Sequence, residues 1–277
     1  MSTLKKIIKS FIPPIVLNFY SNITNPYGFS GEYKNWEIAQ KLSSGYDSKI
    51  ILEKTKNSLL KVKNCEAAYE RDSFLFDKVQ YSWALLASLL YIASTNENQL
   101  KLLDFGGSLG SSYVQNRFFL SSLKEVHWDI LEQPATAECG QKYFIDEHLK
   151  FYSQIEEYLN ENSPKVVLFS ASLQYLSKPY QTLDLLIQKK TEFILFDRLL
   201  VTDSRDMITI QNVDPIIYEA SYPLWIFNEE NILNYLIKNN YELLTDFDSL
   251  GGNFSIKKTG VKGQHKGYLF KLKNSHV

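Results

Sequence analysis

From residue 100 onward, short apolar runs alternate with amphipathic segments, and this rhythm constrains the fold more than any other feature of the sequence. Strands joined by helical segments of this length pair in parallel, with helices on both faces of the sheet. The sequence therefore predicts an α/β fold, a Rossmann-like doubly wound sheet of seven strands. The predicted strands are residues 100–105, 126–131, 149–152, 165–170, 192–195, 241–247 and 267–272.

Both ends of the chain depart from this rhythm. No helical segment separates residues 241–247 from residues 267–272, so these two strands are predicted to form an antiparallel C-terminal hairpin at the sheet edge. Residues 201–227 are interpreted as a linking stretch. Residues 32–95 have a helical pattern, and residues 1–95 are predicted to form an N-terminal helical cap beside a Rossmann-like domain of residues 96–277.

Charge and cysteine content exclude several classes of protein. The chain carries 30 Lys and Arg against 31 Asp and Glu, a net charge of −1. A balance this even provides no field to hold a nucleic-acid backbone, so no nucleic-acid partner is predicted. Cys65 and Cys139 form no CxxC pair, and the four His are scattered, so no metal site is predicted. Two distant cysteines are typical of reduced thiols in a cytoplasmic protein.

Membrane contact is predicted only at the N-terminus. The longest apolar stretch, residues 81–93, has 13 residues where a span needs roughly 20, and it is interpreted as a buried helix. The first 31 residues contain Lys5, Lys6 and Lys9 and no acid. Residues 1–12 can therefore lie on an anionic membrane surface, at the inner face of the plasma membrane, or form a helix packed on their own domain.

The most informative stretch is LLDFGGSLG, residues 102–110, in which a strand ends in an acid and passes through three glycines into a helix. Gly106, Gly107 and Gly110 let the backbone turn and approach a ligand, and the helix that follows offers free N–H groups. The next strand ends at Glu132, whose carboxylate can accept both hydroxyls of a ribose. Loop and acid together predict a nucleoside pocket.

Asp104 indicates which nucleoside cofactor this pocket takes. A carboxylate two residues before the first glycine repels a pyrophosphate and attracts a cation. S-adenosylmethionine carries a sulfonium and an ammonium group, so the sequence favours this cofactor over NAD. No Tyr is followed four residues later by Lys, and no phosphate loop of the form GxxxxGK[ST] is present. Nicotinamide chemistry and nucleotide hydrolysis therefore have less support.

Three segments resemble the motifs of class I S-adenosylmethionine-dependent methyltransferases: LLDFGGSLG, LEQ at the end of the second strand, and VVLFSASLQYL. Nearly end to end, the chain is also similar to a methyltransferase family associated with bacterial surface-polysaccharide gene clusters. This second likeness includes FSGEYKNWEIAQKLSSGYD, AYERDSFLFD and FDRLL. In the class I fold a seventh strand lies antiparallel beside the last parallel strands. Ser108 departs from the general motif, in which a glycine is common.

The resemblance implies roles for individual residues. Asp104 is expected near the methionine ammonium, and Glu132, followed by Gln133, near the ribose. Tyr175 is expected to stack on the ligand or to reach the acceptor. The residues expected to line the amino-acid moiety or to close the pocket floor are Gly106, Gly107, Ser108, Gly110, Ser170 and Ala171.

The candidates for catalysis and substrate binding are supported by weaker sequence patterns than the cofactor-binding residues. A hydroxyl or protonated amine acceptor needs a general base, and His265 and Asp197 are the candidates. Arg198 is a candidate substrate ligand, and so are Arg71 and Asp72. The alternatives stay open: a solvated loop histidine for His265, a structural ion pair for Asp197 and Arg198, and a charged turn for Arg71 and Asp72.

Together these observations predict a methyltransferase that uses S-adenosylmethionine. Its partner is expected to be a small-molecule or glycan acceptor, a sugar hydroxyl or amine of a surface glycan or of its nucleotide-linked precursor. This acceptor class follows from the resemblance alone. An NAD(P)-dependent sugar oxidoreductase and a catalytically silent scaffold of a polysaccharide-assembly complex are the alternatives, and the oligomeric state stays open.

Overall fold

The computed structural model describes residues 27–45, 48–71 and 73–273. Residues 1–12, predicted as a membrane contact, and Asp72, predicted as a substrate ligand, lie outside these described residues. Within the described ranges, no helix combines the length and the apolar character that crossing a bilayer requires.

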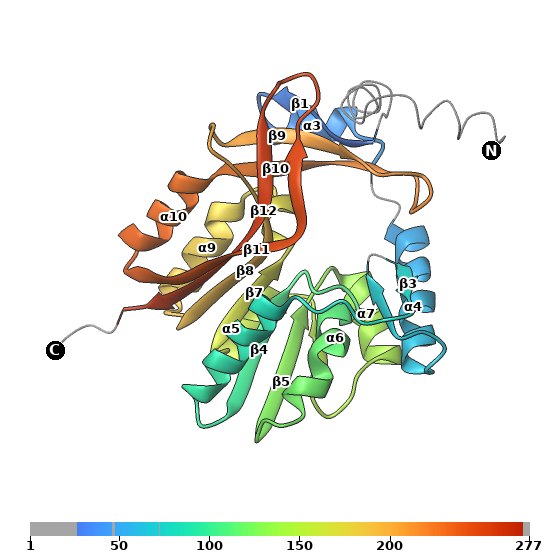
Figure 1. Ribbon diagram of the computed structural model, residues 1–277, viewed down its shortest axis with the longest axis vertical. Helices are drawn as coiled ribbons and strands as arrows, with labels where there is room; N and C mark the ends of the chain where they lie inside the picture. The colour runs from blue at the N-terminus through green and yellow to red at the C-terminus, as the bar shows by residue number, and fades with distance from the viewer. Residues whose placement is uncertain (1–26, 46–47, 72, 274–277) are drawn as a thin grey trace, which may run out of the picture.

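A large mixed sheet organises the molecule, and its centre is parallel (Figure 1). The central strands lie in the order β6-β5-β4-β7-β8, and every neighbouring pair among them is parallel. The chain runs outward from β4 and then returns to β7, so the order reverses between these two strands, as in a doubly wound fold. The strands are β4 (Gln99–Phe105), β5 (Glu125–Leu131), β6 (Leu149–Tyr152), β7 (Val166–Ser170) and β8 (Phe193–Thr202).

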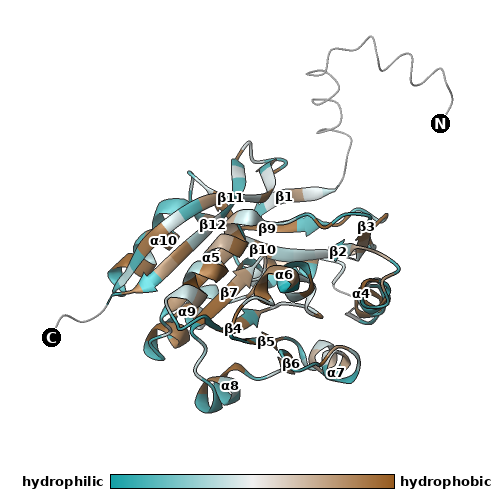
Figure 2. Cartoon of the chain, turned by 60° about the horizontal axis from the view of Figure 1, so that its bottom comes forward, coloured by the Kyte–Doolittle hydropathy of each residue, from teal (hydrophilic) through white to brown (hydrophobic). Residues whose placement is uncertain are grey.

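Helices cover both faces of the sheet, and the central strand β7 is apolar on both sides. In β7, Val166 and Leu168 pack in one core cluster with α5, α6 and α7, whereas Val167 and Phe169 pack in a second with α8, α9 and α10. Figure 2 shows the hydrophobic character of α5. The helices are α5 (Trp83–Ser94), α6 (Ser111–Leu120), α7 (Pro134–Tyr143), α8 (Ile155–Glu161), α9 (Pro179–Gln188) and α10 (Glu229–Lys238).

The predicted C-terminal hairpin is confirmed. β11 (Tyr241–Ser255) and β12 (Lys262–Leu272) pair antiparallel, and β12 pairs antiparallel with β8. Together with the five parallel strands they make up the predicted seven, which confirms the Rossmann-like fold class. Both hairpin strands are longer than predicted, because the pairing between them continues to Ser255 and Lys262.

The interpretation of residues 201–227 as a link is wrong. This segment contains β9 (Met207–Asn212) and most of β10 (Ser221–Asn228), which pair antiparallel, and β1 (Gly28–Tyr33) pairs antiparallel with β9. The end of β10 pairs in parallel with the end of β8. The described part of the sheet therefore has ten strands. β9 and β10 are neighbours in the sequence but were assigned to a link, whereas β1 pairs with a strand far away in the sequence.

The helical interpretation of residues 32–95 holds only in part. α3 (Trp36–Leu42), α4 (Ser48–Lys63) and α5 are helical, but β2 (Tyr69–Arg71) and β3 (Phe74–Phe76) form a small antiparallel hairpin between α4 and α5. α5 packs on the main sheet, and β1 belongs to it. The domain boundary at residue 95 stays a prediction.

Gly140 lets α7 lie close to β6, and this contact predicts the effect of a substitution. A Cβ atom on Gly140 would lie 2.3 Å from Cδ1 of Phe151, whose side chain is buried. Although Ala ordinarily favours a helix over Gly, we expect Gly140→Ala to lower the free energy of unfolding by about 1–3 kcal/mol through overpacking. Urea denaturation measures this change. Glu138→Ala, at an exposed position of the same helix, is the control, and a Gly140→Ala protein as stable as wild type would contradict the prediction.

Candidate functional site

The glycine loop lies between the end of β4 and the start of α6, and at its glycines the backbone comes too close to neighbouring atoms to carry side chains. Gly106 has a φ of +71°, and a Cβ there would lie 2.7 Å from Cβ of Ser172. A Cβ on Gly107 would lie 2.5 Å from Cγ of Asp104. Gly110, with a φ of +99°, is the N-cap of α6. Ser108 also adopts the left-handed region, with a φ of 55°, so the position where glycine is common keeps a conformation that glycine favours.

Asp104 is fully buried beneath this loop. Its Oδ2 accepts a hydrogen bond of 3.1 Å from Nε1 of Trp128, whereas Oδ1 has no hydrogen-bond partner among the described residues. Burial raises the pKa of Asp104 to about 7, opposed by the Trp128 hydrogen bond, and the nearby Glu132 carboxylate raises it further. A buried, half-satisfied carboxylate against a glycine loop is an arrangement that a cationic ligand would complete.

Glu132, at the end of the neighbouring strand β5, holds the other side of the loop. Its Oε1 accepts a hydrogen bond from the Ser108 N–H at 3.0 Å, and its Oε2 accepts one from the Gln133 N–H at 2.9 Å. Burial raises the pKa of Glu132, and these two N–H donors oppose the shift. A carboxylate has about four lone-pair sites, so both oxygens retain the capacity to accept ligand hydroxyls. Gln133 is exposed and is the N-cap of α7.

The end of β7 brings Ser170, Ala171 and Ser172 to the same edge. The side chain of Ser172 occupies the space that a side chain on Gly106 would need. The buried Oγ of Ser172 has no hydrogen-bond partner among the described residues. Ala171 has a positive φ of 56°, and its N–H donates to the Asp197 carbonyl at 2.8 Å. Sequence reasoning did not select Ser172. Its place two residues after a central strand, at the reversal of strand order, was the available signal.

Asp197 and Arg198 lie in β8, in a dense polar network. The buried Asp197 accepts hydrogen bonds from Ser170 Oγ at 2.9 Å and from Ser249 Oγ at 3.0 Å. Nε of Arg198 lies 3.5 Å from Oδ2 of Asp197, and its Nη2 donates to Ser170 Oγ at 3.2 Å. These contacts favour the alternative of a structural ion pair. The roles of Asp197 as a base and of Arg198 as a substrate ligand stay predictions.

His265 lies within β12, opposite Leu200 of β8, and not in the loop before the final strand. Its Nδ1 is 2.9 Å from the Gly252 carbonyl oxygen. Because a carbonyl oxygen only accepts, Nδ1 must carry hydrogen, and the neutral ring keeps its basic lone pair on Nε2. Burial lowers the pKa of His265, which favours this neutral form. The protonation state suits a base, although no described contact joins the ring to the glycine loop.

Two further predicted residues, Tyr175 and Arg71, contact other parts of the structure. Tyr175, in a short 3₁₀ helix at Leu173–Tyr175, donates through its hydroxyl to Gln211 at 2.8 Å and contacts the ring of Tyr222, so it faces β9 and β10. The guanidinium of Arg71 lies over the Phe76 ring, 5.4 Å from its centre. Neither has a described contact with the glycine loop.

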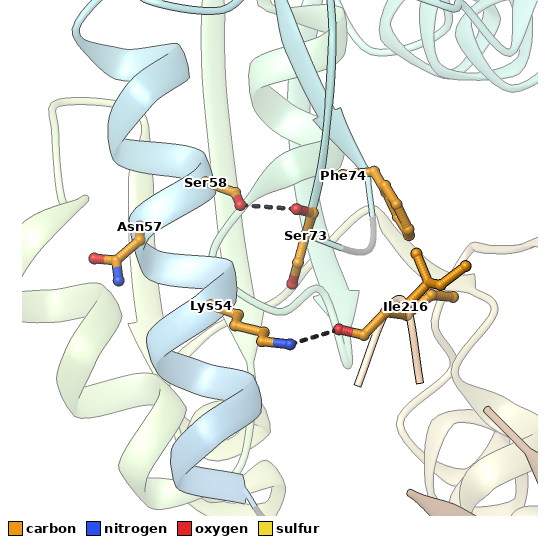
Figure 3. Close-up of a pocket in the computed structure, with 7 residues that line it drawn as sticks. Lys54, Asn57, Ser58, Ser73, Phe74 and Ile216 are labelled. Atoms are coloured by element: carbon orange, nitrogen blue, oxygen red, sulfur yellow. Dashed lines mark hydrogen bonds between the residues drawn. The ribbon is translucent and has the colours of Figure 1, made fainter. Parts of the chain in front are cut away.

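A hollow of about 300 Å³ lies apart from the loop, between α4, β3 and residues 216–217 (Figure 3). Lys54 donates to the Ile217 carbonyl at 2.7 Å, and Ser58 donates to the Ser73 carbonyl at 2.8 Å. Two of its polar side chains thus already donate hydrogen bonds to backbone carbonyls of the lining. The buried acids around the glycine loop are the stronger candidate for chemistry.

No group of three or more His, Cys, Asp and Glu side chains among the described residues could hold a metal ion. The order of the seven core strands, with β12 antiparallel between β8 and β11, matches the arrangement implied by the class I resemblance.

No protein-family model and no curated protein matches the sequence. Similar solved structures include LepI in complex with S-adenosylmethionine, at 10% identity and a TM-score of 0.43, covering 68% of this chain and 46% of that one. The chain thus spans about half of LepI. CalS10, an amino pentose methyltransferase from Micromonospora echinaspora solved with S-adenosylmethionine, has 11% identity, a TM-score of 0.44 and coverages of 70% and 92%. An S-adenosylmethionine-dependent methyltransferase from Clostridium acetobutylicum has 15% identity, a TM-score of 0.42 and coverages of 79% and 99%. At identities this low the function must be argued from the site itself.

The raised pKa of Asp104 predicts a pH-dependent stability. The folded protein holds this proton more tightly than the unfolded chain, whose pKa is near 3.8, so the contribution of Asp104 to stability falls as pH rises from about 4 to about 7. Asp104→Asn removes this penalty. We expect the stability advantage of the variant over wild type to be roughly 3 kcal/mol larger at pH 8 than at pH 5, because each pKa unit corresponds to about 1.4 kcal/mol.

Urea denaturation of both proteins at the two pH values measures this gain. Asp203→Asn, at an exposed acid, is the control. A difference between Asp104→Asn and wild type that is the same at pH 5 and pH 8 would show that Asp104 does not titrate in this range.

Proposed function

We propose that this protein is a methyltransferase that uses S-adenosylmethionine. The observation that carries the proposal is the fully buried Asp104 carboxylate, with one oxygen unpartnered among the described residues, directly beneath a glycine loop whose opposite side is held by Glu132. The two acids end adjacent parallel strands beside the reversal of strand order, where α/β sheets of this kind bind ligands.

The residues present suit each part of this cofactor. Asp104 would attract its cationic ammonium and sulfonium groups, and Glu132 would accept hydroxyl hydrogens from the ribose. The loop residues Gly106, Gly107, Ser108 and Gly110, followed by Gln133 after Glu132, would surround the ligand, with Ser170 and Ala171 at the pocket floor. When bound, the cofactor supplies an electrophilic methyl group. The protein's part is to orient the acceptor and to exclude water.

For an acceptor hydroxyl or protonated amine, His265 is the better candidate for general base. Its neutral ring offers Nε2, whereas both carboxylate oxygens of Asp197 already accept hydrogen bonds from Ser170 and Ser249. Arg198, Arg71 and Tyr175 remain candidates for acceptor binding. The acceptor class, a sugar hydroxyl or amine of a surface glycan or of its nucleotide-linked precursor, rests on the sequence resemblance.

Calorimetry with the full chain tests the cofactor. We expect S-adenosylmethionine and S-adenosylhomocysteine to bind and NAD not to bind. Asp104→Asn should weaken S-adenosylmethionine binding at least about tenfold, because it removes a buried negative charge beside a cation. The exposed Asp203→Asn variant serves as control. Micromolar binding of NAD without binding of S-adenosylmethionine would identify a nicotinamide enzyme instead.

Mass spectrometry of the cell's surface glycan, with and without the protein, tests the acceptor. Loss of one CH₂ mass per modified unit on deletion of the protein, reproduced by Asp104→Ala, is the expected result. If Asp104→Ala abolishes cofactor binding but leaves the methylation pattern intact, catalysis is not the role and a scaffold is the better interpretation.

A further inference from the structure

Glu70 is a buried acid that the sequence analysis did not select. It lies in β2 of the small N-terminal hairpin and is only 1% exposed. Its Oε1 accepts a hydrogen bond from the Ser111 hydroxyl, and its Oε2 accepts one from the Ser73 N–H at 3.1 Å. Ser111 is the first residue of α6 and directly follows Gly110. Glu70 therefore reaches the helical end of the glycine loop from a distant part of the chain.

With Glu70 included, three carboxylates from three strands surround this loop. Asp104 of β4 lies against Gly107, Glu132 after β5 bonds the Ser108 N–H, and Glu70 of β2 bonds Ser111. The unpartnered Oδ1 of Asp104 gives this cluster an independent sign of a ligand, because a fully buried polar atom without a hydrogen bond is costly. The ligand that relieves this cost is one that brings positive charge or hydrogen-bond donors.

The position of Glu70 bears on which ligand the loop admits. The start of a helix after a glycine loop ordinarily attracts phosphate, since its N–H groups and dipole favour negative charge. In this protein the Glu70 carboxylate already accepts a hydrogen bond from the hydroxyl of Ser111, the first residue of α6. A phosphate brought to the same place would meet like charge from Glu70 as well as from Asp104 and Glu132.

We propose that Glu70 is a specificity-determining residue, which makes the glycine loop select a cationic nucleoside cofactor over a phosphate-bearing one. This inference rests on the proposed function and adds to it the residue at the start of α6. A purely structural role, in which Glu70 only ties the β2–β3 hairpin to α6, is the competing explanation. The two differ in outcome because selection depends on the charge of Glu70, whereas tethering depends on the hydrogen bond.

Two variants separate charge from tethering. Glu70→Gln keeps the shape and removes the charge, and Ser111→Ala removes the hydrogen bond and keeps the charge. Calorimetry on the full chain uses three probes: S-adenosylmethionine, S-adenosylhomocysteine, which lacks the sulfonium charge, and ADP-ribose, which carries a pyrophosphate. Glu66→Gln, at an exposed acid before the hairpin, is the matched control.

We expect Glu70→Gln to weaken S-adenosylmethionine about tenfold, to weaken S-adenosylhomocysteine by less, and to strengthen ADP-ribose. Ser111→Ala and Glu66→Gln should leave the ratio of the first two affinities within twofold of wild type. An equal loss for all probes in Glu70→Gln, or the same ratio change in Ser111→Ala, would overturn the proposal in favour of tethering.

Two further readouts keep the outcome clear. If Glu70→Gln does not fold, Ser111→Lys places a compensating cation at the half-buried start of α6, and the same loss of preference is expected. An unchanged preference in Ser111→Lys would then overturn the proposal. Binding of S-adenosylmethionine to the wild-type protein tests the proposed function separately. If the wild-type protein binds this cofactor and no variant alters its preference over ADP-ribose, only the proposed role of Glu70 is refuted.

Discussion

The burial of the Asp104 carboxylate beneath the glycine loop is the constraint on which the rest of the site depends. β4 is the central strand from which the chain runs outward in both directions, so its last residues are enclosed by neighbours on both sides. An acid there is kept in place by the Trp128 indole on one oxygen and by a loop that lacks a side chain at Gly107. A larger residue at Gly107 would displace either the acid or the loop.

This arrangement is costly for stability and useful for binding. Burial makes the charged form of Asp104 unfavourable, and its unpartnered oxygen adds to the cost. Strained or half-satisfied groups of this kind are concentrated at functional sites, where a ligand supplies the missing interaction. The left-handed backbone at Ser108 and Ala171 lies at the same edge of the sheet. A buried unpartnered carboxylate oxygen and two left-handed non-glycine residues thus lie at one edge of the sheet.

Much of the fold could be predicted because it depends on local pattern. Strands such as Val166–Ser170 are apolar on both faces, and helical segments separate them, so a parallel sheet with helices on each side follows from the alternation alone. The glycine loop with Asp104 and Glu132 could be found for the same reason, since both acids end predicted strands. The roles of His265 and Asp197 were harder to assign, because their partners Gly252 and Ser249 lie in a hairpin longer than its pattern indicated.

The sequence by itself determined the doubly wound sheet, the antiparallel hairpin and the pairing of a glycine loop with two acids, because side-chain periodicity and strand ends encode them locally. Only the tertiary structure decided that β1 and β9 join the sheet and that Glu70 meets the start of α6. The Thr209 hydroxyl bonds the Gly31 carbonyl across 178 positions, and Glu70 bonds Ser111 across 41. No local period records contacts of that range, since they form only when the packed sheet brings the segments together.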